Sequence, residues 1–343
     1  VAGNGMDIGI DEARDLVRDA AMAAGANART AASLADATVA AEIAGHPSVG
    51  LAHLPDYLEG FASGRIAGAA EPNISFPTPT TIRVDARAGI AQLGFDLTFD
   101  RLVDTTKRTG VGLFLQAGSY TAGELGYYTR RLAEANLVAF AASNGPALVT
   151  TAESGVPVFG TNPLSFAAPT ADGRPLVIDQ ASSAAAFVKV REAVSRGETI
   201  PEAWALDAAG RPTTDPREAL SGVLLAFGGA RGANIALMVE VLAAGLTGAD
   251  WSLDAPSFVG GTESPGAGLF VAAFDPAGLA PDLPARLTAH AERLAARGIY
   301  VPGRQPPRER ISIEPSLFAA IARWRRSEAE TPRGAPVPSE PSG

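Results

Sequence analysis

The sequence predicts an α/β fold in which helices and strands alternate and pack in layers. Two observations support this class. Along most of the 343 residues, segments with apolar residues at helical spacing alternate with short apolar runs of strand length. Apolar residues make up 46% of the chain and charged residues 19%, which is an ordinary globular balance. The length suits one large domain or two closely packed lobes.

Helical patterns dominate the first part of the chain. We expect helices over residues 11–22 and 27–44, where apolar side chains recur on one face. The segment GHPSVG interrupts this pattern at Gly45 and Pro47. A third helix follows, and Gly64 is expected to end it.

The rest of the chain alternates between the two periodicities. Residues 116–123 form a loop rich in Gly, and the Pro-, Ser-, Glu- and Gly-rich stretch 327–343 is expected to be disordered. Further strands are expected at 81–85, 90–93, 111–115, 137–142, 164–168, 175–178 and 268–274, and further helices at 96–108, 124–135, 231–247 and 281–297.

Composition excludes several classes of function. The net charge of −9 argues against nucleic acid as a partner, because phosphate binding needs clustered Lys and Arg. The chain has no Cys and three His without HExxH spacing, so we expect no disulfide, no thiol nucleophile and no metal site. No apolar run reaches the roughly 18 residues of a membrane span. We also see no signal peptide and expect a cytoplasmic protein.

Nucleotide-binding motifs of the common kinds are missing. No GxGxxG follows a first strand, and no GxxxxGK[ST] is present. An ordinary dinucleotide-binding fold is therefore not indicated by motif.

Six collinear segments carry a resemblance to the malate/L-lactate dehydrogenase type 2 family. This family includes ureidoglycolate and sulfolactate dehydrogenases and Δ1-piperideine-2-carboxylate reductases. The segments are AEIAGHPSVGLAHLPDYLEGFASGRI (41–66), FGTNPLSFAAP (159–169), LVIDQASSAAAFVKV (176–190), IPEAWALDAAGRPTTDP (200–216), GGARGANIALMVEVLAAGLTGA (228–249) and IYVPGR (299–304).

The resemblance implies a fold and a cofactor. It implies three layers, α/β/α, around a mixed sheet, with N-terminal helices, an NAD(P) site unlike the Rossmann type, NADPH or NADH as cofactor, and a homodimer. It also suggests a division of the chain. Residues 1–115 would form a helical, substrate-side segment and 116–270 the NAD(P)-binding core, while 271–326 would return to the first lobe ahead of the disordered tail.

The resemblance also implies a set of cofactor-binding residues. Arg231 and Gly232 open a long helix, where free N–H groups and the positive end of the helix dipole suit a phosphate. The expected cofactor contacts are Tyr120, Thr121, Gly123, Asn144, Thr161, Asn162, Asp179, Gln180, Ala181, Arg231, Gly232, Gly303 and Arg304.

The proton-transfer residues of the family are replaced. Its S-H-G turn reads Ser48-Val49-Gly50, and the Arg one helical turn later, a substrate ligand in the family, is His53. The second family His corresponds to Thr121. We therefore take Ser48, His53, Lys189 and Thr121 as the catalytic candidates.

Each of these residues also has a structural interpretation. Lys189 matches a position that is Lys in the dehydrogenases and Asp in the imine reductases, and it is otherwise a solvated lysine. His53 is either a catalytic group or a partly buried histidine. His46 is interpreted as a turn residue before Pro47 in preference to a catalytic one, and His290 as a surface residue.

Three functions remain open. The first is an NAD(P)H-dependent reductase of an imine or another atypical substrate, because an iminium already carries its proton and needs no acid in the hydride step. The second is a pseudoenzyme that retains the fold. The third is a non-redox enzyme built on the same fold.

Overall fold

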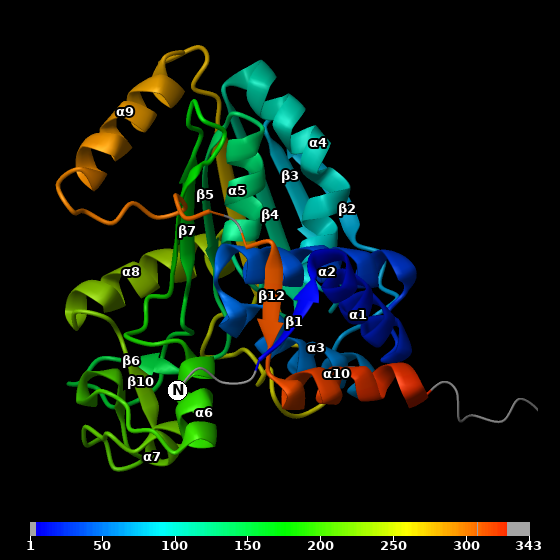
Figure 1. The fold of residues 1–343 in the computed structure, drawn as a ribbon, viewed down its shortest axis with the longest axis vertical. Helices are drawn as coiled ribbons and strands as arrows, with labels where there is room; N and C mark the ends of the chain where they lie inside the picture. Colours follow the sequence, from blue (N-terminus) through cyan, green and yellow to red (C-terminus); the bar gives the residue numbers. More distant parts are fainter. Residues whose placement is uncertain (1–4, 307, 328–343) are drawn as a thin grey trace, which may run out of the picture.

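A seven-stranded mixed sheet forms the centre of the molecule, in the order β2-β3-β4-β11-β5-β7-β8 (Figure 1). The computed structural model describes residues 5–306 and 308–327. Strands β3 and β4 run parallel, and the other neighbouring pairs run antiparallel. The strands are β2 (Asn73–Thr78), β3 (Thr81–Asp85), β4 (Val111–Ser119), β5 (Val138–Ser143), β7 (Leu164–Ala168), β8 (Leu176–Gln180) and β11 (Ala267–Phe274).

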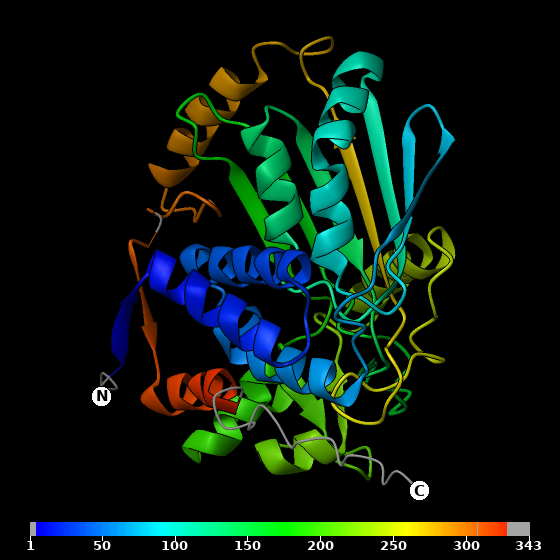
Figure 2. The same cartoon turned by 90° about the vertical axis from the view of Figure 1, so that its right-hand side faces the viewer.

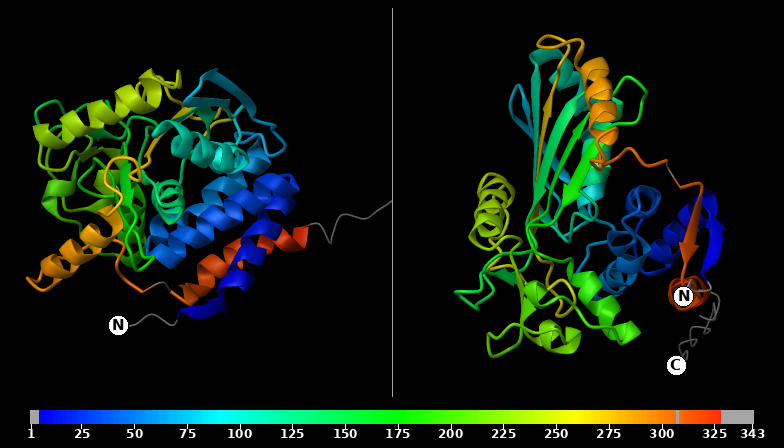
Figure 3. Two further views of the ribbon diagram at one scale, coloured as in Figure 1. Left: turned by 90° about the horizontal axis from the view of Figure 1, so that it is seen from above. Right: turned by 60° about the vertical axis from the view of Figure 1, so that its left-hand side comes forward.

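Helices cover both faces of this sheet. Figure 2 shows α4 and α5 in front of the strands, and Figure 3 (left) shows α8 on the opposite side. Side chains alternate along β11, so Leu269 and Val271 enter one apolar layer and Phe270 and Ala272 the other. The predicted three-layer α/β/α fold is confirmed. The covering helices are α4 (Ala91–Thr109), α5 (Gly126–Glu134), α8 (Ala230–Glu240) and the π-helical turn η4 (Val241–Gly245).

Gly268 lets η4 approach the sheet closely. A Cβ atom at this position of β11 would lie 1.7 Å from the carbonyl oxygen of Ala243. No side chain fits in that space, so glycine is required where the π-helical turn crosses the strand.

The N-terminal helices form a separate lobe beside the sheet. The Asn27 side chain accepts a hydrogen bond from the Thr30 N–H and begins α2, and Gly45 and Gly64 end α2 and α3 in left-handed conformations. The lobe is completed by residues distant in the sequence, because β1 pairs with β12 (Figure 1). Its elements are β1 (Met6–Gly9), α1 (Ile10–Ala23), α2 (Ala28–Ala44), α3 (Leu54–Ser63), β12 (Arg310–Ile313) and α10 (Pro315–Ser327).

A small third lobe lies at the opposite end of the molecule from α9 (Leu283–Ala295) (Figure 1). Its three-stranded sheet has the order β6-β10-β9. The apolar cluster of this lobe includes Val149, Val190, Ala205 and Leu224. Its elements are β6 (Val149–Thr150), α6 (Phe187–Arg196), β9 (Ala205–Leu206), α7 (Pro216–Ser221) and β10 (Val223–Leu225).

Most of the expected helices and strands are present in the structure. The expected segments that differ lie at residues 90–93, 116–119 and 231–247. The prediction of a strand at 90–93 is wrong, because Ile90 precedes α4 and the following residues already form its first turn. Residues 116–119, expected in a loop, continue β4. The helix expected over 231–247 is α8 followed by the π-helical turn.

The predicted segment boundaries at 115 and 270 fall inside β4 and β11, so the central sheet is continuous across both. The predicted disordered tail lies outside the described residues, apart from Ser327 at the end of α10. Within the described residues, no helix combines the length and apolar character that a bilayer crossing requires.

Candidate functional site

A cleft of about 650 Å³ opens where the N-terminal lobe, the central sheet and the small lobe meet. This volume lies in the range of small-molecule and cofactor sites. Loops contribute most of its lining, chiefly residues 45–49, 121–124 and 143–146. The end of β8 and the start of α6 line the opposite wall.

The fold brings most of the predicted site residues to this one cleft. They come from distant parts of the sequence, which is consistent with a composite site. The predicted residues that line it are Ser48, His53, Thr121, Gly123, Asn144, Thr161, Asp179, Gln180, Ala181 and Lys189.

Two predicted cofactor contacts are buried in the protein instead. The Tyr120 ring has no exposed surface, and its hydroxyl donates to the carbonyl oxygen of Phe258 at 2.6 Å. The Asn162 amide is fully buried and donates to Glu240 Oε2 at 2.7 Å. Neither side chain lines the cleft, so both serve internal packing.

The residues predicted to bind phosphate also lie outside the cleft. Arg231 is exposed at the start of α8, and Gly232 allows the close approach of the Phe227 backbone. Gly303 packs against the β8 backbone. The Arg304 guanidinium binds Asp172, with 2.7 Å between Nη2 and Oδ2.

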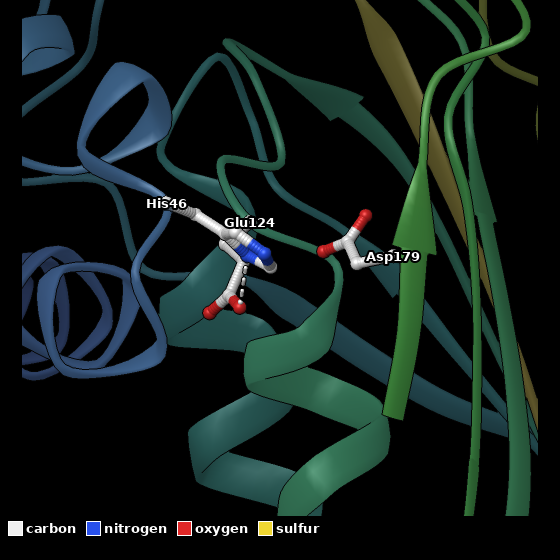
Figure 4. Close-up of side chains that lie close together, drawn as sticks. All are labelled: His46, Glu124 and Asp179. Atoms are coloured by element: carbon white, nitrogen blue, oxygen red, sulfur yellow. Dashed lines mark hydrogen bonds and ion pairs between the residues drawn. The ribbon is translucent and has the colours of Figure 1, made fainter. Parts of the chain in front are cut away.

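His46, Glu124 and Asp179 form a compact group in the cleft (Figure 4). His46 Nδ1 lies 2.9 Å from Glu124 Oε1, and Arg130 Nη2 donates to the same oxygen at 2.7 Å. Asp179 Oδ2 accepts the N–H of Gly126, at the start of α5, at 2.6 Å. One ligand-type atom from each of the three side chains lies within 4.8 Å of the others. The Arg130 cation already neutralises Glu124, which favours proton exchange over cation binding in this group.

Burial and neighbouring charges shift the pKa values of these three groups in different directions. Burial raises the pKa of Glu124, but hydrogen bonds from His46 and Arg130 outweigh it and hold this pKa below its usual value. The hydrogen bond to Glu124 raises the pKa of His46, against the effect of burial. Burial and the nearby Glu124 charge raise the pKa of Asp179 to about 6. Glu124 is therefore ionised at neutral pH, the pKa of Asp179 moves toward neutrality, and that of His46 lies above its usual value.

A second histidine, His53, lies in the same cleft with its own carboxylate. His53 Nδ1 lies 2.8 Å from Asp56 Oδ2, and Arg191 Nη2 donates to that oxygen at 2.8 Å. Although burial opposes it, hydrogen bonds from His53 and Arg191 lower the pKa of Asp56 to about 2. An ionised carboxylate accepts, so Nδ1 of His53 donates and Nε2 faces Thr121 Oγ1 at 3.5 Å.

Thr121 is fixed by the aromatic side chains beside it. Its hydroxyl donates to the Tyr57 oxygen at 2.7 Å, and Tyr57 packs edge-on against His53. Val49 also lines the cleft, and its side chain can neither donate nor accept a proton. Val49 therefore takes no part in proton transfer, whereas the two histidines of the cleft each contact a carboxylate.

The wall formed by α6 suits an anionic, extended cofactor. This helix begins after Ala186, which has no side-chain cap, and its first turn from Phe187 to Lys189 lines the opening. At Gly145 a Cβ atom would meet nothing within 4 Å, so the opposite wall leaves open space. These residues fit a nicotinamide dinucleotide, whose phosphates need N–H donors and a cation.

Sequence reasoning missed part of this site. His46 was interpreted as a turn residue, and Glu124 was not considered at all. Their contact joins residues separated by 78 positions, and nothing in the spacing marks it. The available signal was Glu124 itself, a carboxylate directly after the glycine-rich loop that ends at Gly123.

Known proteins share this fold and sequence. The family model for malate/L-lactate dehydrogenase matches residues 8–313. A (2R)-3-sulfolactate dehydrogenase (NADP(+)) from Chromohalobacter salexigens is 40% identical over 271 residues, which are 79% of this chain and 81% of that protein. A Δ1-pyrroline-2-carboxylate reductase from Ancylobacter novellus is 33% identical over 342 residues, covering 95% of this chain and 98% of the relative.

A solved structure agrees with these relatives. The crystal structure of Δ1-piperideine-2-carboxylate reductase from Pseudomonas syringae superimposes with a TM-score of 0.83 at 32% identity. The superposition covers 93% of this chain and 94% of that one. The predictions of the family and of an NAD(P)-dependent oxidoreductase are confirmed, and the chain belongs to the malate/L-lactate dehydrogenase family.

Proposed function

We propose that this protein reduces a small cyclic imine that carries a carboxylate, with NADPH as the reductant. The observation that carries the proposal is Val49, an aliphatic side chain at the cleft wall where the family resemblance places a proton-donor histidine. A ketone needs an acid at its oxygen as the hydride arrives, whereas the more basic nitrogen of an imine takes its proton in an earlier, separate step. Relatives named as pyrroline- and piperideine-2-carboxylate reductases support the same substrate class.

Different residues of the cleft would bind the cofactor and orient the substrate. When bound, NADPH supplies the hydride. The α6 N-terminus and Lys189 attract its phosphates or the substrate carboxylate. His53, held by Asp56, and Thr121, held by Tyr57, form a rigid wall that orients the substrate ring. Ser48, beside Val49, offers a hydroxyl to the same space.

Oxidation of a sulfonated 2-hydroxy acid is the second candidate. It is supported by the Chromohalobacter salexigens relative, named as a sulfolactate dehydrogenase, and by Lys189, which matches the lysine of the dehydrogenases. A lysine in the cleft suits a sulfonate or carboxylate, because its ammonium group is a compact positive charge.

A substrate panel separates these candidates. Purified protein is assayed with NADPH and with NADH against Δ1-pyrroline-2-carboxylate, Δ1-piperideine-2-carboxylate and pyruvate, and with NADP⁺ against (2R)-3-sulfolactate and malate. We expect turnover of the two imines with NADPH and little turnover of pyruvate or malate. Sulfolactate oxidation without imine reduction would favour the second candidate. Failure of NADPH to bind at millimolar concentration, measured by calorimetry, would leave the pseudoenzyme or non-redox interpretation.

The cofactor contacts outside the cleft are tested separately. Arg231 lies at the start of α8 and is not among the residues that line the cleft. Arg231 and Gly232 at the start of α8, and Gly303 and Arg304 beside β8, stay proposed cofactor contacts at two separate places. Arg231→Ala should weaken NADPH binding by about 1–3 kcal/mol if its guanidinium bonds to phosphate. Unchanged affinity would assign Arg231 to the surface.

We also propose a cytoplasmic homodimer. One observation supports the dimer: α8 and the turn after it expose large apolar side chains, which single-chain surfaces seldom gather together. These are Leu237, Met238, Val241, Leu246, Trp251 and Leu253. Light scattering at tens of micromolar should give twice the chain mass, and a monomer would contradict the proposal.

A further inference from the structure

We propose that His46 donates the proton to the substrate nitrogen, with Glu124 and Asp179 as its positioning residues. This inference rests on the proposed imine reduction and deepens it by naming the acid. It assigns the role to a residue ahead of the Ser48-Val49 turn, in a cluster formed by three separate elements (Figure 4).

The hydrogen bonds of His46 leave one ring nitrogen free for chemistry. Glu124 is ionised and accepts, so His46 Nδ1 carries a proton and donates to it at 2.9 Å. Nε2 is then the titrating atom. The side chain of His46 is 40% exposed in a cleft-lining loop, whereas Glu124 is 1% exposed. The buried carboxylate thus holds a partly exposed imidazole, which can meet both substrate and water.

The hydrogen bond to Glu124 and the carboxylates around His46 raise its pKa above the usual value. Glu124 and Asp179 face it as carboxylates, and Arg130 as a cation. Arg130 and Glu124 neutralise each other, so the Asp179 charge remains to balance an imidazolium. The other titratable groups along the cleft are His53, Lys189 and Glu192, and Arg308 lies near Gly45 beside Glu42.

The proposed step balances in atoms and electrons. The Nε2–H bond of the imidazolium breaks and an N–H bond forms on the lone pair of the imine nitrogen, which leaves His46 neutral and the substrate as an iminium. The iminium carbon would then accept the hydride that bound NADPH supplies, and the C=N π electrons would become the lone pair of the amine nitrogen. Water then returns a proton to Nε2 across the exposed edge of the ring, and NADP⁺ leaves.

His53 is less suited to this step. Its side chain is 9% exposed, and the rings of Tyr57 and Phe258 pack edge-on against it. Its Nε2 faces the Thr121 hydroxyl. A proton lost there is not readily replaced by water, so His53 orients the substrate while His46 exchanges protons.

The test compares three matched histidine substitutions across pH. The variants are His46→Gln, His53→Gln and His290→Gln, the last being an exposed residue of α9 that serves as the control. With Δ1-piperideine-2-carboxylate and saturating NADPH at pH 8, kcat of His46→Gln should fall about 100-fold or more, the range of general-acid effects. The loss should shrink at acidic pH, where solution already protonates the imine. His290→Gln should match the wild type.

A second readout is independent of turnover. The chain has three histidines, so the imidazole NMR signals can be assigned by the three substitutions. The His46 pKa should lie above that of an ordinary imidazole, and Glu124→Gln should move it down. A His46 titration that Glu124→Gln leaves unchanged would overturn the inference even if the protein reduces no imine. Active wild type with unchanged kcat and pH profile in His46→Gln would overturn it while the proposed function stands.

Discussion

The cleft contains two imidazole–carboxylate–guanidinium groups that are built alike but placed differently. In one, His46 contacts Glu124, which Arg130 holds; in the other, His53 contacts Asp56, which Arg191 holds. The histidine contacts differ by 0.1 Å, at 2.9 and 2.8 Å. Geometry within each group therefore does not distinguish their roles.

The surroundings of the two groups do distinguish them. The His46 side chain is 40% exposed and faces a second carboxylate, Asp179, whereas the His53 side chain is 9% exposed among aromatic rings. A proton donor must be recharged from solvent, while an orienting group must be rigid. The exposure of His46 thus suits the proposed proton exchange, and the burial of His53 suits positioning.

The largest expected effect comes from removing the buried carboxylate of the His46 group. Glu124→Gln leaves the Arg130 guanidinium without its anion, so the free energy of unfolding should fall by about 3 kcal/mol, near the lower end for broken buried pairs. Urea unfolding at pH 7 measures it. A loss below about 1 kcal/mol would mean that solvent replaces the ion pair.

The matching change in the His53 group should lower the free energy of unfolding by a smaller amount. Asp56→Asn removes the anion shared by His53 and Arg191, and Asp56 is more exposed than Glu124, at 15% against 1%. We expect a loss of about 2 kcal/mol in the same urea experiment, since hydrogen bonds to charged groups are being weakened. A loss larger than that of Glu124→Gln would reverse the comparison.

Replacing Asp179 should have the opposite effect and raise the free energy of unfolding. Its folded pKa is raised to about 6 from 3.8, so the folded state binds the proton more tightly than the unfolded state. The resulting stability is fully present below pH 3.8 and is lost as pH rises through about 6. Asp179→Asn avoids that loss and should be more stable than wild type by about 1–2 kcal/mol at pH 8.

The pH dependence supplies the control for this prediction. At pH 4 the wild-type Asp179 is largely protonated in the fold, so the advantage of Asn should nearly vanish. Thermal unfolding at both pH values measures the difference. An advantage of equal size at pH 4 and pH 8 would show that burial of charge is not its cause.

The smallest effect is expected from the orienting histidine. His53→Gln keeps a hydrogen-bonding side chain beside Thr121, so KM for the imine should rise about 10-fold while kcat changes less than about 3-fold. Steady-state kinetics at pH 7 measure both constants. A large fall in kcat with unchanged KM would instead make His53 the proton donor.

Local patterns predicted the elements whose signals lie within one segment. The helices at 11–22 and 27–44 follow from apolar spacing, and the buried strand at 268–274 from an unbroken apolar run. Residues 90–93 were misassigned because their short apolar pattern fits the start of a helix equally well. Strands β1 and β12 were missed because each is short and is formed only by pairing with the other.

Site residues could be predicted from the sequence only where they lie within a recognisable motif. Asp179 and Lys189 were found within one conspicuous segment, and the structure places both at the cleft. Arg304 looked like a free cation, but its pairing with Asp172 depends on tertiary contact. The role of His46 could not be predicted either, because it depends on tertiary contacts. Its partners Glu124 and Asp179 are both distant from it in the sequence.

The pairing of β1 with β12 has a consequence for how the chain is made. Ile8, Leu16 and Leu34 share one apolar cluster with Ile311 and Ile321, so part of the apolar face of the N-terminal helices stays uncovered until almost the whole described chain has left the ribosome. During synthesis these helices present apolar surface that chaperones recognise. A nascent chain stopped at residue 300 should therefore remain sensitive to protease in its first 66 residues.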